Sequence, residues 1–190
     1  MKIYLTMTAE FRKGIAKYIT GDSRFKEIPK NDYRRLIYEW ARKEFRNMKR
    51  MYKHHVKVPR PHALKGNVIV MEFIGEEGKR APLVKELVPE LKANLGLAKE
   101  IYRQTRVNLE RIVCYTKLVH ADLSEFNLMF WRKRVYIIDV SQSISLDHPM
   151  AKEFLVRDLN NIFRFFRGFI GEEDLQEDAI KQKLFSCIYS

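Results

Sequence analysis

Cysteine is scarce in this chain, and its two cysteines do not form a recognisable motif. Cys114 and Cys187 lie far apart, and neither belongs to a Cys-x-x-Cys motif or stands beside paired histidines. Disulfide frameworks and zinc sites are predicted from such spacings. We therefore expect neither of them, which fits a reducing compartment.

Long apolar runs are also missing. The N-terminal stretch MKIYLTMTAEFRKG lacks the apolar segment of a signal peptide, and no later run approaches the roughly 20 residues that cross a bilayer. We therefore expect a soluble protein with no membrane partner. The sequence shows no internal repeat, and its oligomeric state stays open.

Acidic residues are too few to balance the basic ones. The 190 residues include 36 lysines and arginines against 24 aspartates and glutamates, which gives a formal net charge of +12. Such an excess favours a polyanionic partner, namely RNA or phosphorylated ligands, and a merely solvated basic surface is the alternative. The hydrophobic content of 46% is enough for the core of one or two domains.

A polar loop followed by two short apolar runs organises the sequence. The loop is His120–Asn127, and the runs are Leu128–Trp131 and Val135–Ile138, with three basic residues between them. This pattern predicts a β-hairpin whose second strand delivers Asp139 at its end. A carboxylate directly after a buried strand needs a cation nearby, because an unpaired buried charge is costly.

The hairpin should bring Asn127 beside Asp139, with Asp122 a few residues upstream in the same loop. An amide oxygen and a carboxylate are ligands that suit Mg²⁺, which keeps waters and usually binds phosphate oxygens as well. Asp122 would then accept a proton or orient a nucleophile. The spacing His-x-Asp-x4-Asn, then a hairpin ending in Asp, is typical of the protein-kinase catalytic loop. A chance coincidence of three polar residues is the alternative, but it would not require the hairpin.

The N-terminal third predicts a strand, a long loop, a helix and a second hairpin. The strand covers Lys2–Leu5, the loop Thr6–Lys30, and the helix Asn31–Tyr52, with Asn31 or Asp32 as its N-cap. Glu44 lies within the apolar stripe of this helix and needs a partner, for which Lys2 is the candidate. A glutamate at the exposed edge of the stripe is the alternative.

The later segments predict a second hairpin, a boundary and three helices. The hairpin is His62–Phe73 around Gly66-Asn67, and Ile74–Pro82 has the composition of a linker or of an ordinary turn. Core-facing helices are expected over Lys92–Tyr115 and Met150–Gly168, and a last helix over Glu172–Cys187.

Taken together, these segments resemble a RIO-type atypical protein kinase of the RIO-one branch. The residues that carry the resemblance are Lys2–Tyr4, Lys17–Phe25, Trp40–Asn47, Val70–Gly75, Ala81–Leu83, Val119–Asn127, Ile137–Gln142 and Asp147–Pro149. They follow the order of the family from residue 1 to about residue 168.

The resemblance implies an α+β, protein-kinase-like fold. A truncated, small, β-rich N-lobe would cover residues 1–74, and a mainly helical C-lobe residues 75–190. Lys2 and Glu44 would form an ion pair, and backbone groups near Glu72 and Ile74 would bind adenine.

The resemblance also implies a function. Asn127 and Asp139 would hold Mg²⁺ for ATP, Asp122 would be the catalytic base, and Asp139 would also take up phosphate. The family acts as a serine/threonine kinase or ATPase in cytoplasmic maturation of the small (40S) ribosomal subunit. This implies a pre-40S particle and its pre-rRNA as partners, and the cytoplasm, with shuttling to the nucleus as an option, as location.

One departure from the family keeps a second reading open. The family has a phosphate-cradling loop on two strands upstream of its lysine strand, whereas this sequence begins one residue before Lys2 and contains no Gly-x-Gly motif. We interpret the sequence either as a fragment or late-start gene model, or as a protein that lacks part of the ATP clamp. The alternative function is a weakly active or inactive, pseudokinase-like scaffold that binds pre-ribosomal RNA.

Overall fold

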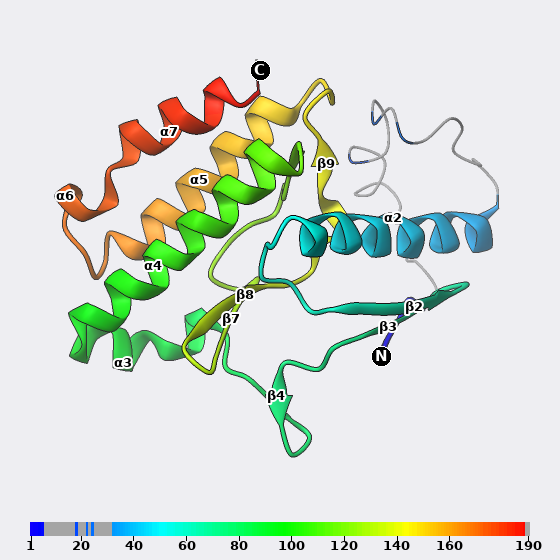
Figure 1. Cartoon of the computed structure of the whole chain (residues 1–190), viewed down its shortest axis with the longest axis horizontal. Coiled ribbons are helices and arrows are strands. Elements are labelled where there is room, and N and C mark those ends of the chain that lie inside the picture. Colours follow the sequence, from blue (N-terminus) through cyan, green and yellow to red (C-terminus); the bar gives the residue numbers. More distant parts are fainter. Residues whose placement is uncertain (6–17, 19–21, 23, 25–31, 189–190) are drawn as a thin grey trace.

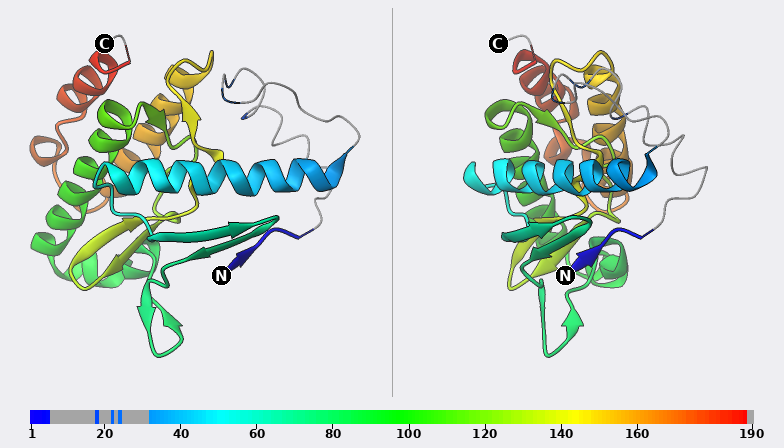
Figure 2. Two further views of the ribbon diagram at one scale, coloured as in Figure 1. Left: turned by 45° about the vertical axis from the view of Figure 1, so that its right-hand side comes forward. Right: turned by 90° about the vertical axis from the view of Figure 1, so that its right-hand side faces the viewer.

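The first part of the fold is a three-stranded sheet with a long helix across it. The computed structural model describes residues 1–5, 18, 22, 24 and 32–188. Strands β1 (Lys2–Ile3), β2 (Pro61–Lys65) and β3 (Val68–Met71) form an antiparallel sheet in the order β1-β3-β2. Helix α2 (Tyr33–Lys53) lies along this sheet in both views of Figure 2. The predicted strand, helix and hairpin are therefore confirmed.

Helix α2 begins where its sequence signals place it. The side chain of Asp32 caps the helix by accepting a hydrogen bond from the backbone N–H of Arg35 at 3.0 Å. Its apolar stripe is buried, with Trp40 and Met51 among the largest fully buried side chains. The predicted loop Thr6–Lys30 lies outside the described residues apart from Tyr18, Asp22 and Arg24.

The second part of the fold is mainly helical, with α4, α5 and α7 packed together in Figure 1. A two-stranded hairpin, β7–β8, lies between these helices and the N-terminal sheet. The remaining elements are β4 (Gly75–Glu76), β5 (Lys79–Arg80), η1 (Val84–Leu87), α3 (Val88–Ala93), α4 (Leu95–Glu110), the π-helical turn η2 (Arg111–Tyr115), β6 (Leu118–Val119), β7 (Leu128–Trp131), β8 (Arg134–Ile137), η3 (Val140–Gln142), β9 (Ile144–Ser145), α5 (Ala151–Phe166), α6 (Glu172–Leu175) and α7 (Glu177–Ser186).

Two predicted helices are each interrupted once. Asn94 is extended and caps α4 by accepting a hydrogen bond from the Leu97 N–H at 2.9 Å, so the predicted helix Lys92–Tyr115 is divided between α3 and α4. Gln176 is left-handed, with φ of 51°, and separates α6 from α7. Both breaks depend on local backbone geometry, which the apolar spacing does not report. The helix expected over Met150–Gly168 is confirmed as α5.

The predicted linker Ile74–Pro82 contains a small antiparallel hairpin. Strands β4 and β5 pair through Gly75 with Arg80 and through Glu76 with Lys79. Gly75 has φ of 155° and no room for a side chain, since a Cβ there would lie 2.1 Å from the carbonyl oxygen of Lys79. Polar composition alone did not distinguish this hairpin from a linker.

The structure pairs Cys114 with Cys187 in a disulfide, so the prediction of no disulfide is wrong. The two cysteines are 73 residues apart in sequence, and their Cα atoms are 5.0 Å apart. The first belongs to η2 and the second follows α7 directly. Helix α7 packs against α5 and forms an ion pair with α4 through Lys183 and Glu110, and this placement brings the two cysteines together. Sequence spacing carries no trace of this contact.

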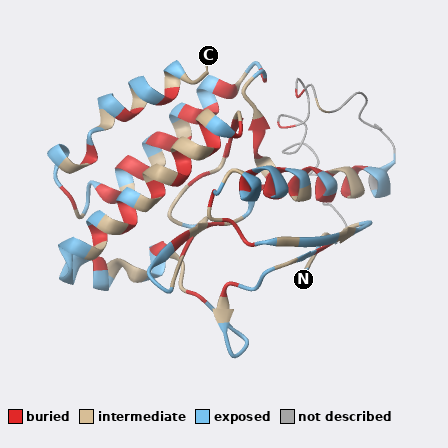
Figure 3. Cartoon of the chain, in the orientation of Figure 1, coloured by how far each residue is buried: buried red, intermediate tan, exposed pale blue. Residues whose placement is uncertain are grey.

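One contiguous apolar core joins both parts of the chain. Figure 3 shows buried positions along the facing sides of α2, α4 and α5. The core includes Trp40 and Ile69 from the first part and Ile101, Leu123 and Phe163 from the second. The predicted boundary at residues 74 and 75 stays a prediction. Within the described ranges, no helix is long and apolar enough to cross a bilayer.

Candidate active site

The predicted loop His120–Asn127 is held in an uncommon backbone conformation by helix α5. Ala121 is left-handed, with φ of 66°, which is uncommon for a residue other than glycine. The carboxylate of Asp158, on α5, accepts hydrogen bonds from the N–H groups of Ala121 and Leu123, both at 2.8 Å. Arg157 donates to the carbonyl of Ala121 from the other side. These contacts fix the backbone on both sides of Asp122.

The side chains of Asp158 and His120, which both contact this loop or belong to it, are buried. Burial raises the pKa of Asp158 to about 7, against the backbone donors and Arg157, which favour the ionised form. Burial also lowers the pKa of His120, whose Nε2 lies 3.3 Å from the carbonyl oxygen of Ile138. A neutral His120 therefore connects the loop to the end of strand β8.

The predicted hairpin is confirmed as β7 and β8. Leu128 pairs with Ile137 and Trp131 with Arg134, and the N–H of Ile138 bonds to the carbonyl of Asn127 at 3.0 Å. This register places Asn127 across from the residue before Asp139. Asp139 itself is left-handed, with φ of 54°, and so turns the chain out of the strand.

The amide of Asn127 and the carboxylate of Asp122 are oriented by local hydrogen bonds. Asn127 donates from Nδ2 to the carbonyl of Asp122 at 2.7 Å, which fixes the amide and leaves Oδ1 as its acceptor. Gln142 donates from Nε2 to Oδ2 of Asp122 at 3.1 Å. The loop and the segment after the hairpin are thus tied together through Asp122.

Lys2 lies between its predicted partner Glu44 and a second carboxylate, that of Asp139, with which the sequence did not associate it. Its Nζ is 2.8 Å from Oε1 of Glu44 and 3.1 Å from Oδ1 of Asp139. The side chain of Glu44 is 1% exposed and that of Asp139 48% exposed. Glu44 therefore belongs to the buried face of α2, and the alternative of a surface glutamate is excluded.

This arrangement shifts three pKa values. Burial raises the pKa of Glu44, although Lys2 opposes that effect. Burial lowers the pKa of Lys2, but the two carboxylates outweigh it and the pKa is raised. Partial burial raises the pKa of Asp139, while Lys2 and the hydroxyl of Ser141 lower it more, so the balance is a lowered pKa. Asp139 is therefore ionised at neutral pH.

A cavity of about 490 Å³ opens beside this cluster. Most of the residues that line it are apolar. The lining also includes the charged residues Lys2, Glu44 and Asp139. The backbone around Glu72 and Ile74 forms part of the same lining. The carbonyl of Ile74 accepts a hydrogen bond from the N–H of Ala81 at 2.9 Å. The backbone group of Ile74 that remains for a planar ligand is therefore the N–H. The cavity is lined by Met1, Lys2, Glu44, Met48, Val58, Pro59, Met71, Glu72, Phe73, Ile74, Arg80, Met129, Ile137, Ile138, Asp139 and Val140.

The order of these elements and the position of the loop are those of one known domain. A sequence model of the RIO domain matches residues 1–180 of the chain. The chain belongs to the RIO domain family. Its RIO domain therefore includes the sheet, the loop with Asp122 and the hairpin that ends at Asp139.

Curated relatives of this RIO domain carry the names of protein kinases. The chain is 44% identical over 170 residues to "Serine/threonine-protein kinase RIO1" of Caenorhabditis elegans, and 41% identical over 167 residues to the human protein of that name. These matches cover 88% and 87% of the chain but 32% and 28% of the relatives, so the chain spans about a third of their length. It is also 37% identical to "RIO-type serine/threonine-protein kinase Rio1" of Thermoplasma acidophilum, with 96% of the chain and 93% of that protein covered.

Solved structures confirm the fold of the RIO domain. The Rio2 kinase from Chaetomium thermophilum, in a complex described as ADP/Mg²⁺-phosphoaspartate, matches with a TM-score of 0.59 and 23% identity over 87% of the chain and 55% of that protein. A second structure of the same kinase matches with a TM-score of 0.60 and 21% identity, over 86% and 60%. The α+β, kinase-like fold class is therefore confirmed.

The donor atoms of the RIO domain fit the Mg²⁺ that the sequence implies. Asn127 and Asp139 offer an amide oxygen and a carboxylate, which are hard ligands that leave room for water and phosphate oxygens. Over the described ranges, no three acidic, histidine or cysteine side chains gather closely enough to hold a metal by themselves. A site with two protein ligands, completed by a phosphate ligand, suits this chemistry, and the roles of Asn127 and Asp139 stay a prediction.

Several residues around the site received no role from the sequence. Tyr4 donates its hydroxyl to Oε2 of Glu44, so this carboxylate is held at both oxygens. Asn47, one turn after Glu44, donates to the carbonyl of Val140 at 2.9 Å. A polar residue inside an apolar helical stripe was a usable signal for Asn47, as it is for Asp158 on α5. Tyr4 carried no such signal.

Proposed function

We propose that this RIO domain binds ATP with Mg²⁺ and acts as an atypical serine/threonine kinase or ATPase. The observation that carries the proposal is the cavity in which Lys2, paired with Glu44, lies beside Asp139. The cavity also reaches the backbone of Glu72 and Ile74, where an adenine edge finds a carbonyl and an N–H. The site combines a cation that can bind phosphate, oxygens that can bind a metal, and backbone groups that can bind a planar base. This combination suits a nucleoside triphosphate.

Each residue of the site has a separate role in the proposed reaction. Lys2 neutralises phosphate oxygens and is kept charged by Glu44, whose own position Tyr4 fixes. Asn127 and Asp139 hold Mg²⁺, which when bound neutralises charge on the phosphates. Asp122 accepts the proton of an attacking hydroxyl while the new oxygen–phosphorus bond forms and the bond to the leaving diphosphate breaks.

Asp139 is also our candidate for a phosphate acceptor. In that step a carboxylate oxygen of Asp139 attacks the terminal phosphorus, ADP leaves, and water later hydrolyses the acyl phosphate. The lowered pKa of Asp139 supports this role because the attacking carboxylate must be ionised. The solved Rio2 relative, described as an ADP/Mg²⁺-phosphoaspartate complex, supports it as well.

Calorimetry with Mg·ATP tests the proposal. The wild-type chain should bind, Asp139→Ala should lose most of the signal, and the exposed Asp178→Ala serves as the control with the same change of charge. Asp122→Asn should still bind but should release phosphate more slowly, by a factor on the order of 10²–10⁴. Equal heats from wild type and Asp139→Ala, or no heat from either, would defeat the enzymatic proposal.

We further propose a role in maturation of the small (40S) ribosomal subunit, with the pre-40S particle and its pre-rRNA as partners. The support is the family resemblance and the net charge of +12. The location would be the cytoplasm, with shuttling to the nucleus as an option. Phosphate release measured with and without purified pre-40S particles tests this role, and a rate indifferent to the particles would count against it.

A scaffold that binds pre-ribosomal RNA without turnover is the second candidate. The ion pair between Lys2 and Asp139 favours it, because in this arrangement the phosphate-binding cation neutralises the metal-binding carboxylate. RNA binding that is unaffected by Asp139→Ala, together with an absence of phosphate release from wild type, would support the scaffold.

A further inference from the structure

A basic groove runs along the side of the molecule outside the nucleotide cavity. It consists of two adjoining cavities of about 490 Å³ and about 340 Å³, and Lys57 lines both. Val58 and Glu72 line the first of them and also the cavity beside Lys2 and Asp139, so the two cavities share these wall residues. We define the basic groove by the residues Tyr52, Lys53, His55, Val56, Lys57, Val58, Glu72, Arg103, Gln104, Val107, Asn108, Arg111, Lys133, Arg134 and Tyr136.

Most of the charged residues that line the basic groove are positively charged. Its described lining contains six lysines and arginines and a single carboxylate, that of Glu72. Glu72 is engaged locally, since its Oε2 accepts the N–H of Arg60 at 3.0 Å. Within the described part of the chain, Lys53, Lys57, Lys133 and Arg134 form no salt bridge, so their charges face solvent uncompensated.

Two amide side chains hold the walls of the groove in place. Asn108, which is buried, accepts the N–H of Lys57 at 3.0 Å and donates to the carbonyl of Val135 at 3.3 Å. Gln104 accepts the N–H of Val135 at 2.9 Å and donates to the carbonyl of Lys133 at 2.9 Å. The backbones that carry the free cations are therefore fixed, which lowers the ordering cost of binding a polyanion.

Two tyrosines accompany these cations. Tyr52 is 44% exposed, and Tyr136 is half-buried against the small apolar cluster around Met129. Apolar anchors for a peptide are scarce here, because Val56 and Val58 are buried. Fixed cations interleaved with aromatic rings are the arrangement that binds single-stranded nucleic acid, through its phosphates and by stacking of unpaired bases.

We propose that the basic groove binds single-stranded RNA. Lys57, Lys133 and Arg134 contact successive phosphates, and Tyr52 and Tyr136 stack on bases. The choice of RNA over DNA rests on the proposed ribosomal role, whereas the groove itself requires no catalysis. Asp139→Ala should therefore abolish Mg·ATP binding without changing RNA affinity, so the two proposals fail separately.

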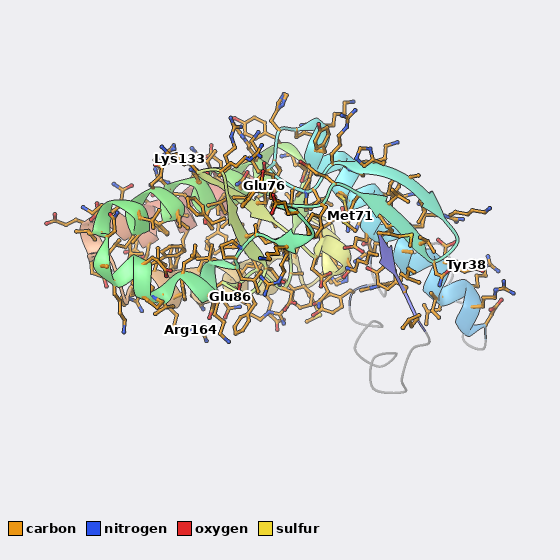
Figure 4. The ribbon with its side chains drawn as sticks, turned by 90° about the horizontal axis from the view of Figure 1, so that it is seen from below. Tyr38, Met71, Glu76, Glu86, Lys133 and Arg164 are labelled. Carbon is orange, nitrogen blue, oxygen red and sulfur yellow. A yellow bond between two sulfur atoms is a disulfide. The ribbon has the colours of Figure 1, made fainter. Side chains whose placement is uncertain are left out.

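Fluorescence anisotropy with a labelled single-stranded RNA of about 12 nucleotides tests the groove. The variant Lys57→Ala/Lys133→Ala/Arg134→Ala removes three groove cations, and the control Lys79→Ala/Lys92→Ala/Arg164→Ala removes three exposed cations elsewhere. Lys133 and Arg164 lie at opposite edges of the molecule in Figure 4. The groove variant should bind at least tenfold more weakly and lose about 2 from the slope of log K against log salt. The control should stay within threefold of wild type.

Replacing the two tyrosines tests whether base stacking contributes to RNA binding in addition to charge attraction. Tyr52→Leu/Tyr136→Leu should weaken RNA binding by on the order of tenfold with an unchanged salt slope. Circular dichroism of each variant checks that it is folded. Equal losses in the groove and control triple variants would overturn the proposal. So would a polyglutamate or an anionic lipid vesicle that competes as well as RNA while the tyrosine variant binds normally.

Discussion

At the scale of single residues, Asp158 determines the backbone around Asp122. Its two carboxylate oxygens accept the N–H groups of Ala121 and Leu123, both at 2.8 Å. Asp158→Asn should destabilise the fold by about 2 kcal/mol at pH 8, because an amide group turns one acceptor into a donor. It should also slow phosphate release by displacing Asp122. Chemical denaturation measures the first effect, and the exposed Asp178→Asn is the control.

A second residue, Lys43, makes stability depend on pH. Its Nζ is buried, donates to the carbonyl of Ser141 at 3.0 Å, and lies 4.8 Å from the Trp40 ring centroid. Burial and, to a smaller extent, nearby Arg24 lower the pKa of Lys43, and with the opposing effect of Asp22 included the pKa is about 7. The folded state therefore prefers the neutral amine, and the stability that Lys43 contributes falls as pH drops from about 10 towards 7.

We expect the free energy of unfolding to depend more steeply on pH in wild type than in Lys43→Met. Between pH 7 and pH 9 the free energy of unfolding of wild type should rise by about 2 kcal/mol more than that of Lys43→Met. Urea denaturation at the two pH values measures it. Parallel changes in both proteins would show that Lys43 is charged in the folded state.

Single residues also show where sequence reasoning worked. Glu44 was predicted to need a partner because it interrupts an apolar stripe, and Lys2 is found 2.8 Å away. Asp158 interrupts the stripe of α5 in the same way, so its importance could have been predicted. Tyr4 could not, because its contact with Glu44 depends on the angle between β1 and α2.

At the scale of elements, the disulfide attaches the end of α7 to η2. It closes a loop whose ends are 73 residues apart in sequence, so reduction should lower the free energy of unfolding by roughly 2–4 kcal/mol. Denaturation with and without dithiothreitol measures this, and Cys187→Ser, which should not respond to the reductant, is the control. An unchanged wild type would mean that α7 is held by packing alone.

Elements with strong periodic patterns were predictable, whereas their interruptions were not. The hairpin β7–β8 follows from two apolar runs around three basic residues, and the position of Asp139 follows from the hairpin. The breaks at Asn94 and Gln176 depend on single backbone conformations. Apolar spacing continues across both positions and so hides them.

At the scale of the whole molecule, the sequence predicted the kinase-like fold and the pairing of Lys2 with Glu44, but neither the contact of Lys2 with Asp139 nor the basic groove. The groove combines the segment after α2, one face of α4 and the turn of the β7–β8 hairpin. Each contributes a few ordinary basic residues, and their convergence exists only in the folded chain. The same holds for the disulfide. The net charge indicated a polyanion, but it carried no information about where on the surface a polyanion would bind.

Among the residues that the structure describes, few backbone hydrogen bonds hold strand β1. Lys2 and Ile3 pair with β3, and Tyr4 exchanges two hydrogen bonds with Asn67. Because Lys2 belongs to this strand, the proposed nucleotide would meet its cation only in molecules whose β1 is docked. The apparent affinity is then the intrinsic affinity multiplied by the docked fraction, so ligand and strand stabilise one another through a shared equilibrium.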